Sequence, residues 1–62
     1  MTRVIVAGAA GRMGRRIAYM VDRHPDLELA GGFEQPHNPE VGKDMGEVAG
    51  FGQTGVKIAP GR

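Results

Sequence analysis

The 62-residue chain contains no cysteine and no tryptophan, and its other aromatic residues are two phenylalanines and one tyrosine. The absence of cysteine excludes a disulfide framework and a thiolate metal site. No further ligands cluster with His24 and His37, so we expect no metal. The net charge is only +1, without the basic excess of a nucleic-acid-binding domain. No apolar run approaches the roughly 20 residues of a membrane span, and Gly8 interrupts the N-terminal run too early for a secretory signal. We therefore expect a cytoplasmic protein with neither nucleic acid nor membrane as a partner.

Glycine, by contrast, is abundant, with 11 residues. Gly8, Gly11 and Gly14 follow the apolar residues 4–7 and open a helical pattern. A turn this tight needs residues without a Cβ atom, and a dinucleotide's pyrophosphate lies close to such a backbone. The free N–H groups of the first helical turn then face the anion. The G-x-x-G-x-x-G spacing is less common than G-x-G-x-x-G, so the strand before it and the helix after it support the prediction of a dinucleotide site.

The pattern around these glycines predicts a strand, a helix and a second strand. Residues 3–7 are apolar after the first position, which is typical of a strand buried on both faces. Residues 12–23 predict a helix that ends at His24, because Pro25 disfavours helical geometry there. Residues 27–33 predict the second strand. One helix face is predicted from residues at helical spacing, namely Met13, Ile17, Met20, Val21 and His24.

The stretch 34–55 is rich in loop residues but contains one helical signal. Asp44 and Glu47 have the spacing of a capping box, which predicts a short helical turn over residues 45–49. Gly50 would end this turn.

Residues 56–59 predict a third strand. The expected fold class is therefore α/β, a partial Rossmann-type parallel sheet made of a βαβ unit plus a third strand beyond the second. A doubly wound domain does not normally stop at this point. We expect residues 1–62 to be the N-terminal half of a dinucleotide-binding domain, truncated from a longer protein.

Two charged side chains are candidates for the ligand site. Arg12 lies in the first helical turn, where the helix dipole disfavours a cation. A charge placed against this preference beside a glycine turn is typical of a functional site. We therefore expect Arg12 to contact a phosphate, and Arg15 and Arg16 to face solvent. Glu34 follows Gly14 by 20 residues, at the end of the second strand. A carboxylate there accepts hydrogen bonds from the adenosine ribose hydroxyls.

Several segments resemble the beginning of dihydrodipicolinate reductase, a family also called 4-hydroxy-tetrahydrodipicolinate reductase. They are residues 8–15 (GAAGRMGR), 32–34 (GFE), 42–50 (GKDMGEVAG) and 55–56 (GV). The resemblance covers essentially the whole chain. A generic Rossmann domain would not need the segment at 42–50, so the combination is quite specific.

The resemblance implies a nicotinamide dinucleotide as ligand, with Glu34 on the adenosine ribose. The residues it places around the pyrophosphate are Gly8, Ala9, Ala10, Gly11, Arg12 and Met13. Family members that use NADPH well often carry an arginine directly after the acidic residue, where this chain has Gln35. Glutamine brings no charge to a 2′-phosphate, so we expect NAD(H) as cofactor, with NADP(H) as the alternative.

The family reduces a cyclic, imine-like small-molecule intermediate of diaminopimelate and lysine synthesis. Its catalytic histidine and lysine belong to a second domain, and no matching segment occurs here. The resemblance therefore implies an oxidoreductase as the longer parent, a homotetramer, and no catalytic residue within these 62.

Two alternatives remain open at this point. One is another NAD(P)-dependent dehydrogenase, of amino acids or semialdehydes, with a similar first βαβ unit; the segment at 42–50 argues against it. The other is a small non-enzymatic nucleotide-binding domain that ends near Arg62. A stable, monodisperse and cooperatively unfolding 62-residue product would favour the second alternative.

Overall fold

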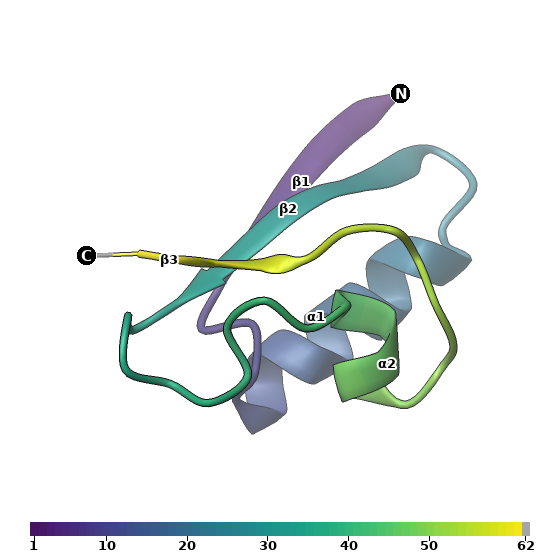
Figure 1. The fold of residues 1–62 in the computed structure, drawn as a ribbon. Helices are drawn as coiled ribbons and strands as arrows, with labels where there is room; N and C mark the ends of the chain where they lie inside the picture. Colours follow the sequence, from purple (N-terminus) through teal and green to yellow (C-terminus); the bar gives the residue numbers. More distant parts are fainter. Residues whose placement is uncertain (62) are drawn as a thin grey trace.

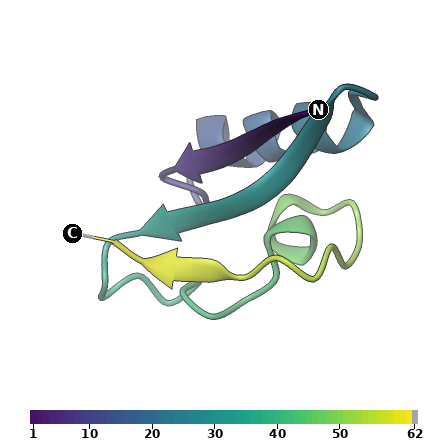
Figure 2. The same ribbon diagram turned by 90° about the horizontal axis from the view of Figure 1, so that it is seen from above.

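Three parallel strands form one sheet, and two helices lie on the same side of it (Figure 1). The elements are β1 (Thr2–Ala7), α1 (Arg12–Arg23), β2 (Leu27–Glu34), α2 (Met45–Ala49) and β3 (Ile58–Pro60). The strand order is β1-β2-β3, and both pairings are parallel. Figure 2 shows the three arrows pointing toward one edge of the sheet. The predicted α/β class and the place of the third strand are confirmed.

The computed structural model describes residues 1–61. Strand β1 confirms the prediction for residues 3–7, but the expected burial on both faces is wrong. Val6 is buried, whereas Ile5 on the opposite face is 66% exposed. The reason is that α1 and α2 cover only one face of the sheet. Pairing of β1 with β2 extends to Ala7, which lies opposite Phe33.

Helix α1 has the predicted bounds and ends at His24, whose φ of −90° and ψ of 123° are extended, as expected before proline. The predicted packing face is right for Val21, which is buried, but wrong for the two methionines. Met13 is 68% exposed and Met20 67%. The buried residues of the helix are Gly14, Ala18 and Val21. The small side chains form the contact because the helix backbone must approach β1 and the glycine turn closely.

The core lies between the covered face of the sheet and the two helices. Its buried members are Val6, Ala9, Ala18, Met45 and Ile58. Strand β2 runs one residue further than the predicted 27–33, and Gly32 within it is buried under the Met45 side chain. A Cβ atom added at Gly32 would stand 2.6 Å from Met45 Cε. The glycine that lowers strand propensity thus makes room for the largest core side chain.

Helix α2 matches the predicted residues 45–49 and ends at Gly50, which has a left-handed φ of 90°. The third strand begins two residues later than predicted. Lys57 forms an isolated antiparallel bridge with Asp44, and Met45 N–H donates to the carbonyl of Val56 at 2.8 Å. Residues 56–57 therefore hold the start of α2, and pairing with β2 begins only at Ile58.

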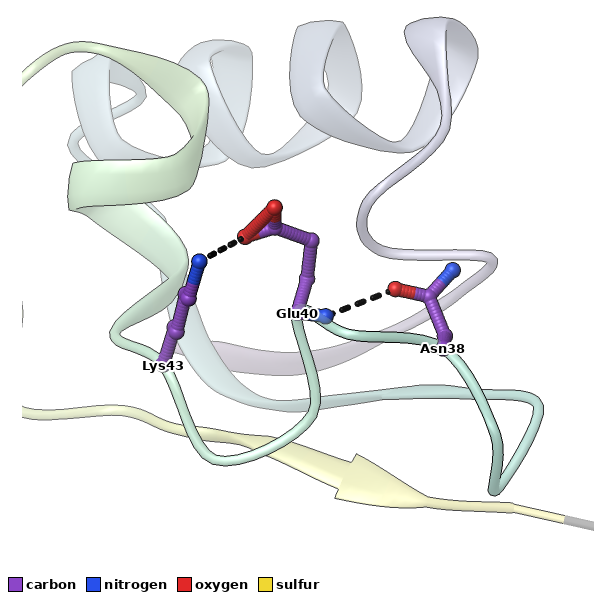
Figure 3. Close-up of polar contacts among 3 residues, drawn as sticks. All are labelled: Asn38, Glu40 and Lys43. Carbon is purple, nitrogen blue, oxygen red and sulfur yellow. Dashed lines mark hydrogen bonds and ion pairs between the residues drawn. The ribbon is translucent and has the colours of Figure 1, made fainter.

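The loop before α2 is organised by local polar contacts (Figure 3). Glu40 N–H donates to Asn38 Oδ1 at 2.8 Å. The Lys43 ammonium lies 3.2 Å from Glu40 Oε2. An ion pair this exposed contributes little to stability, so it shapes the loop rather than holding the fold together.

Within residues 1–61, neither helix has the length and apolar character needed to cross a membrane.

Candidate functional site

The glycine turn joins the carboxyl end of β1 to α1. Gly8 has a left-handed φ of 66°, a conformation that glycine adopts without a steric cost. Gly11 N–H donates to the Gly8 carbonyl at 3.0 Å and closes the turn. Gly11 is also the N-cap of α1, so no side chain caps this helix, and its first turn contains no acidic residue. The helix itself therefore supplies no anion for the positive end of its dipole.

The backbone N–H groups around the turn divide into two sets. Ala9 N–H donates to the Phe33 carbonyl at 3.1 Å, and Ala10 N–H donates to Glu34 Oε2 at 2.8 Å. After Gly11, the N–H groups of the first turn of α1 find no acceptor among residues 1–61; they belong to Arg12, Met13 and Gly14. Orphan donors of this kind at a helix start are a ready anion site.

Glu34 is the last residue of β2 and lies beside the turn, because β1 and β2 are parallel neighbours that end at the same edge. Its side chain is half-buried. Its Oε2 atom accepts from Ala10 N–H, and its Oε1 atom has only a long contact of 3.4 Å with Gln35 N–H. The structure thus places the predicted ribose acceptor against the predicted pyrophosphate loop.

The other predicted ligand residues lie at the same edge of the sheet with different exposure. Ala9 is 3% exposed and packs in the core, so only its backbone borders the turn. Arg12 and Met13 are exposed, as are Arg15 and Arg16. The role of each residue toward a cofactor stays a prediction.

Neither histidine joins the site. His24 lies at the other end of α1, where its Nδ1 accepts from Asp26 N–H at 3.1 Å. His37 is exposed on the loop after β2. No group of three His, Cys, Asp or Glu residues within residues 1–61 converges as metal ligands.

Asp44 has a role that the capping signal shows only in part. Its Oδ1 accepts from Gly46 N–H at 2.8 Å and Glu47 N–H at 3.3 Å, as the predicted helix cap. It also accepts from the backbone N–H and hydroxyl of Thr54, at 2.9 and 3.0 Å, and Oδ2 accepts from Gly55 N–H at 2.7 Å. One carboxylate therefore joins the start of α2, at Gly46, to the residues that lead into β3, at Gly55. No spacing rule links an aspartate to a threonine ten residues later.

The charge state of Asp44 follows from these bonds. Burial alone would raise its pKa, but hydrogen bonds from Thr54, Gly55 and Gly46 stabilise the charged form and lower the pKa from 3.8 to about 2. Because the pKa is lower in the folded state, the carboxylate contributes stability above its unfolded pKa and loses that contribution as the pH falls through about 2.

We expect Asp44→Asn to lower the thermal midpoint at neutral pH, because the amide cannot accept the same set of hydrogen bonds. The difference from wild type should shrink as the pH falls from about 4 toward 2. Thermal unfolding followed across this range measures it, and Asp22→Asn, an exposed aspartate on α1, is the matched control. A difference that is independent of pH would contradict the assigned charge state.

Two surface hollows lie away from the glycine turn. One, of about 700 Å³, is bordered by Val21, Leu29 and Phe51; the other, of about 570 Å³, is bordered by Lys43 and Lys57. Neither is lined by a turn residue or by Glu34. The candidate site instead lies after the carboxyl ends of β1 and β2, which is where open α/β sheets bind their ligands.

The parallel sheet, the glycine turn and the acidic residue at the end of β2 define a partial Rossmann-type α/β unit. The family model described as "Dihydrodipicolinate reductase, N-terminus" matches residues 2–61. The chain belongs to this family, and the resemblance seen in its sequence is confirmed.

Curated relatives agree with the family match. A 4-hydroxy-tetrahydrodipicolinate reductase of Desulfotalea psychrophila is 51% identical over 61 residues, which cover 98% of this chain and 23% of the relative. The protein of the same name from Methanopyrus kandleri is 52% identical over 60 residues, covering 97% of this chain and 22% of the relative. The chain thus spans less than a quarter of the length of these relatives.

Proposed function

We propose that residues 1–62 form the N-terminal half of the dinucleotide-binding domain of a 4-hydroxy-tetrahydrodipicolinate reductase. The longer protein would be a cytoplasmic homotetramer that reduces this small-molecule substrate for diaminopimelate and lysine synthesis. The observation that supports this most strongly is the family match over residues 2–61, together with a glycine turn and Glu34 at one edge of the sheet.

The residues present fit a dinucleotide. The N–H groups of Arg12, Met13 and Gly14 have no acceptor within residues 1–61, and α1 has no acid in its first turn. These donors would hold the pyrophosphate, with the exposed Arg12 guanidinium adding positive charge. Glu34 would accept from the adenosine ribose hydroxyls.

The bound nicotinamide cofactor would supply the hydride for the reduction. This part of the protein binds and orients the adenosine diphosphate end and contributes no catalytic residue. Acid and substrate-binding groups would come from the remainder of the longer protein.

The residue after Glu34 bears on the choice of cofactor. A 2′-phosphate brings about −1.5 to −2 charges close to the Glu34 carboxylate, and Gln35 cannot neutralise them. We therefore propose NAD(H) as the preferred cofactor and NADP(H) as the second.

Gln35→Arg in the complete gene product is expected to improve kcat/KM for NADPH by about 0.5–3 kcal/mol of transition-state stabilisation, the range of net hydrogen bonds that includes those to charged groups. Steady-state kinetics with both cofactors at one ionic strength measure the effect, because phosphate contacts are screened by salt. Gln53→Arg, at another exposed glutamine, controls for the added charge. A wild-type NADPH preference that survives Gln35→Ala and disappears in Arg12→Ala would assign cofactor choice to Arg12 instead.

A further inference from the structure

Strand pairing between β1 and β2 extends into the glycine turn and then changes character. Ala9 N–H still donates to a backbone carbonyl, that of Phe33. The next donor, Ala10 N–H, instead meets the carboxylate of Glu34 at 2.8 Å, in a partly buried contact between residues 24 apart in the sequence. A negative side chain therefore already bonds one donor of the turn.

The surroundings make this carboxylate the anion of the turn. Helix α1 begins directly after it, with no acidic residue in its first turn and no side-chain cap. The positive end of a helix favours a negative charge, and a charge-assisted hydrogen bond is stronger than a neutral one. A phosphate that approaches the free N–H groups of Arg12 and Met13 would meet the Glu34 charge beside them.

We propose that Glu34 acts as an internal anion that competes with phosphate groups at the glycine turn. The turn would thereby select phosphate ligands that carry a ribose diol over bare phosphate or pyrophosphate. This inference rests on the proposed dinucleotide site and adds a selectivity to it.

The selectivity follows from what each ligand offers the carboxylate. A bare pyrophosphate brings only negative charge and is repelled. A nucleoside diphosphate brings the same charge but also two ribose hydroxyls, which donate to a carboxylate at this position. Glu34 Oε1 is suited to accept them, since its present contact with Gln35 N–H is long, at 3.4 Å. The same side chain thus opposes one ligand and recruits the other.

The test is calorimetric titration of the complete gene product with ADP and with inorganic pyrophosphate, at constant ionic strength because both ligands are charged. Glu34→Gln keeps a side chain of the same size and removes the charge, while Glu34→Asp keeps the charge. Glu28→Gln is the matched control, since it removes a charge from the exposed far end of β2.

In Glu34→Gln we expect ADP affinity to fall about tenfold, the scale of a lost hydrogen bond to a charged group. Pyrophosphate affinity should rise about fivefold, the order of one charge–charge contact in a water-like dielectric. Glu28→Gln should leave pyrophosphate affinity at the wild-type value, and Glu34→Asp, which keeps the charge, should not raise it. Opposite shifts for the two ligands cannot come from a general loss of structure, which would weaken both.

If wild type binds ADP but the pyrophosphate affinity of Glu34→Gln is unchanged or lower, the inference is wrong. The proposal of a dinucleotide site then still stands. A rise of equal size in Glu28→Gln would also overturn it, because net charge would then explain the effect. If wild type binds neither ADP nor NADH, the proposed function and this inference both fail.

Discussion

Replacing Gly14 by alanine is expected to destabilise the fold by about 1–2 kcal/mol. Gly14 is buried where α1 crosses the glycine turn. An added Cβ atom would overlap the Gly8 carbonyl oxygen and stand 2.8 Å from the Gly8 carbonyl carbon. Overpacking costs about 1–3 kcal/mol and occasionally more, and backbone cannot yield as a flexible side chain does. The better helix propensity of alanine offsets only about 1 kcal/mol.

The measurement is the thermal midpoint of the complete gene product, with Gly11→Ala as the matched control. At Gly11 the added Cβ atom would make only an ordinary 3.4 Å contact with the Gly8 carbonyl oxygen, and φ of −76° suits alanine. Because glycine is a somewhat better N-cap than alanine, a loss below about 1 kcal/mol is expected there. Equal midpoints for Gly14→Ala and wild type would show that α1 does not pack as described.

Gly11→Ala should have its large effect on cofactor binding instead. Gly11 is exposed at the start of α1, beside the free N–H groups of the first helical turn. If the pyrophosphate lies against this backbone, a methyl group there costs roughly 1–3 kcal/mol, or about 5- to 150-fold in affinity. Titration of the purified variant with NADH measures the loss.

Gly42→Ala is the control for this second prediction, since Gly42 also lies at the surface but far along the chain from the turn. Its φ of 92° makes alanine strained, so it reports what a folding defect alone does to NADH affinity. Wild-type affinity in Gly11→Ala would remove the proposed phosphate role of the turn.

Local signals in the sequence were reliable where one residue decides a conformation. Pro25 ends α1 at His24, and Asp44 and Gly50 bound α2 at the predicted positions. These effects act within a few residues of the backbone, so tertiary contacts did not override them.

Periodicity failed where packing required close approach. Of the predicted helix face, Val21 is buried but Met13 and Met20 are exposed. Gly14 and Ala18, which were not predicted to pack, are buried instead. A hydrophobicity pattern predicts burial from apolar surface. Close contact between α1 and the glycine turn instead requires side chains of small volume.

For this chain, the sequence alone determined the α/β class, the glycine turn, the capped helix α2 and the family. Each depends on backbone conformations or spacings that neighbouring residues dictate. Only the tertiary structure decided which face of α1 packs, that β3 begins at Ile58, and that Asp44 reaches Thr54. It also brought Glu34 to Ala10. These contacts join residues far apart in the sequence, and their geometry depends on how the sheet and helices pack together.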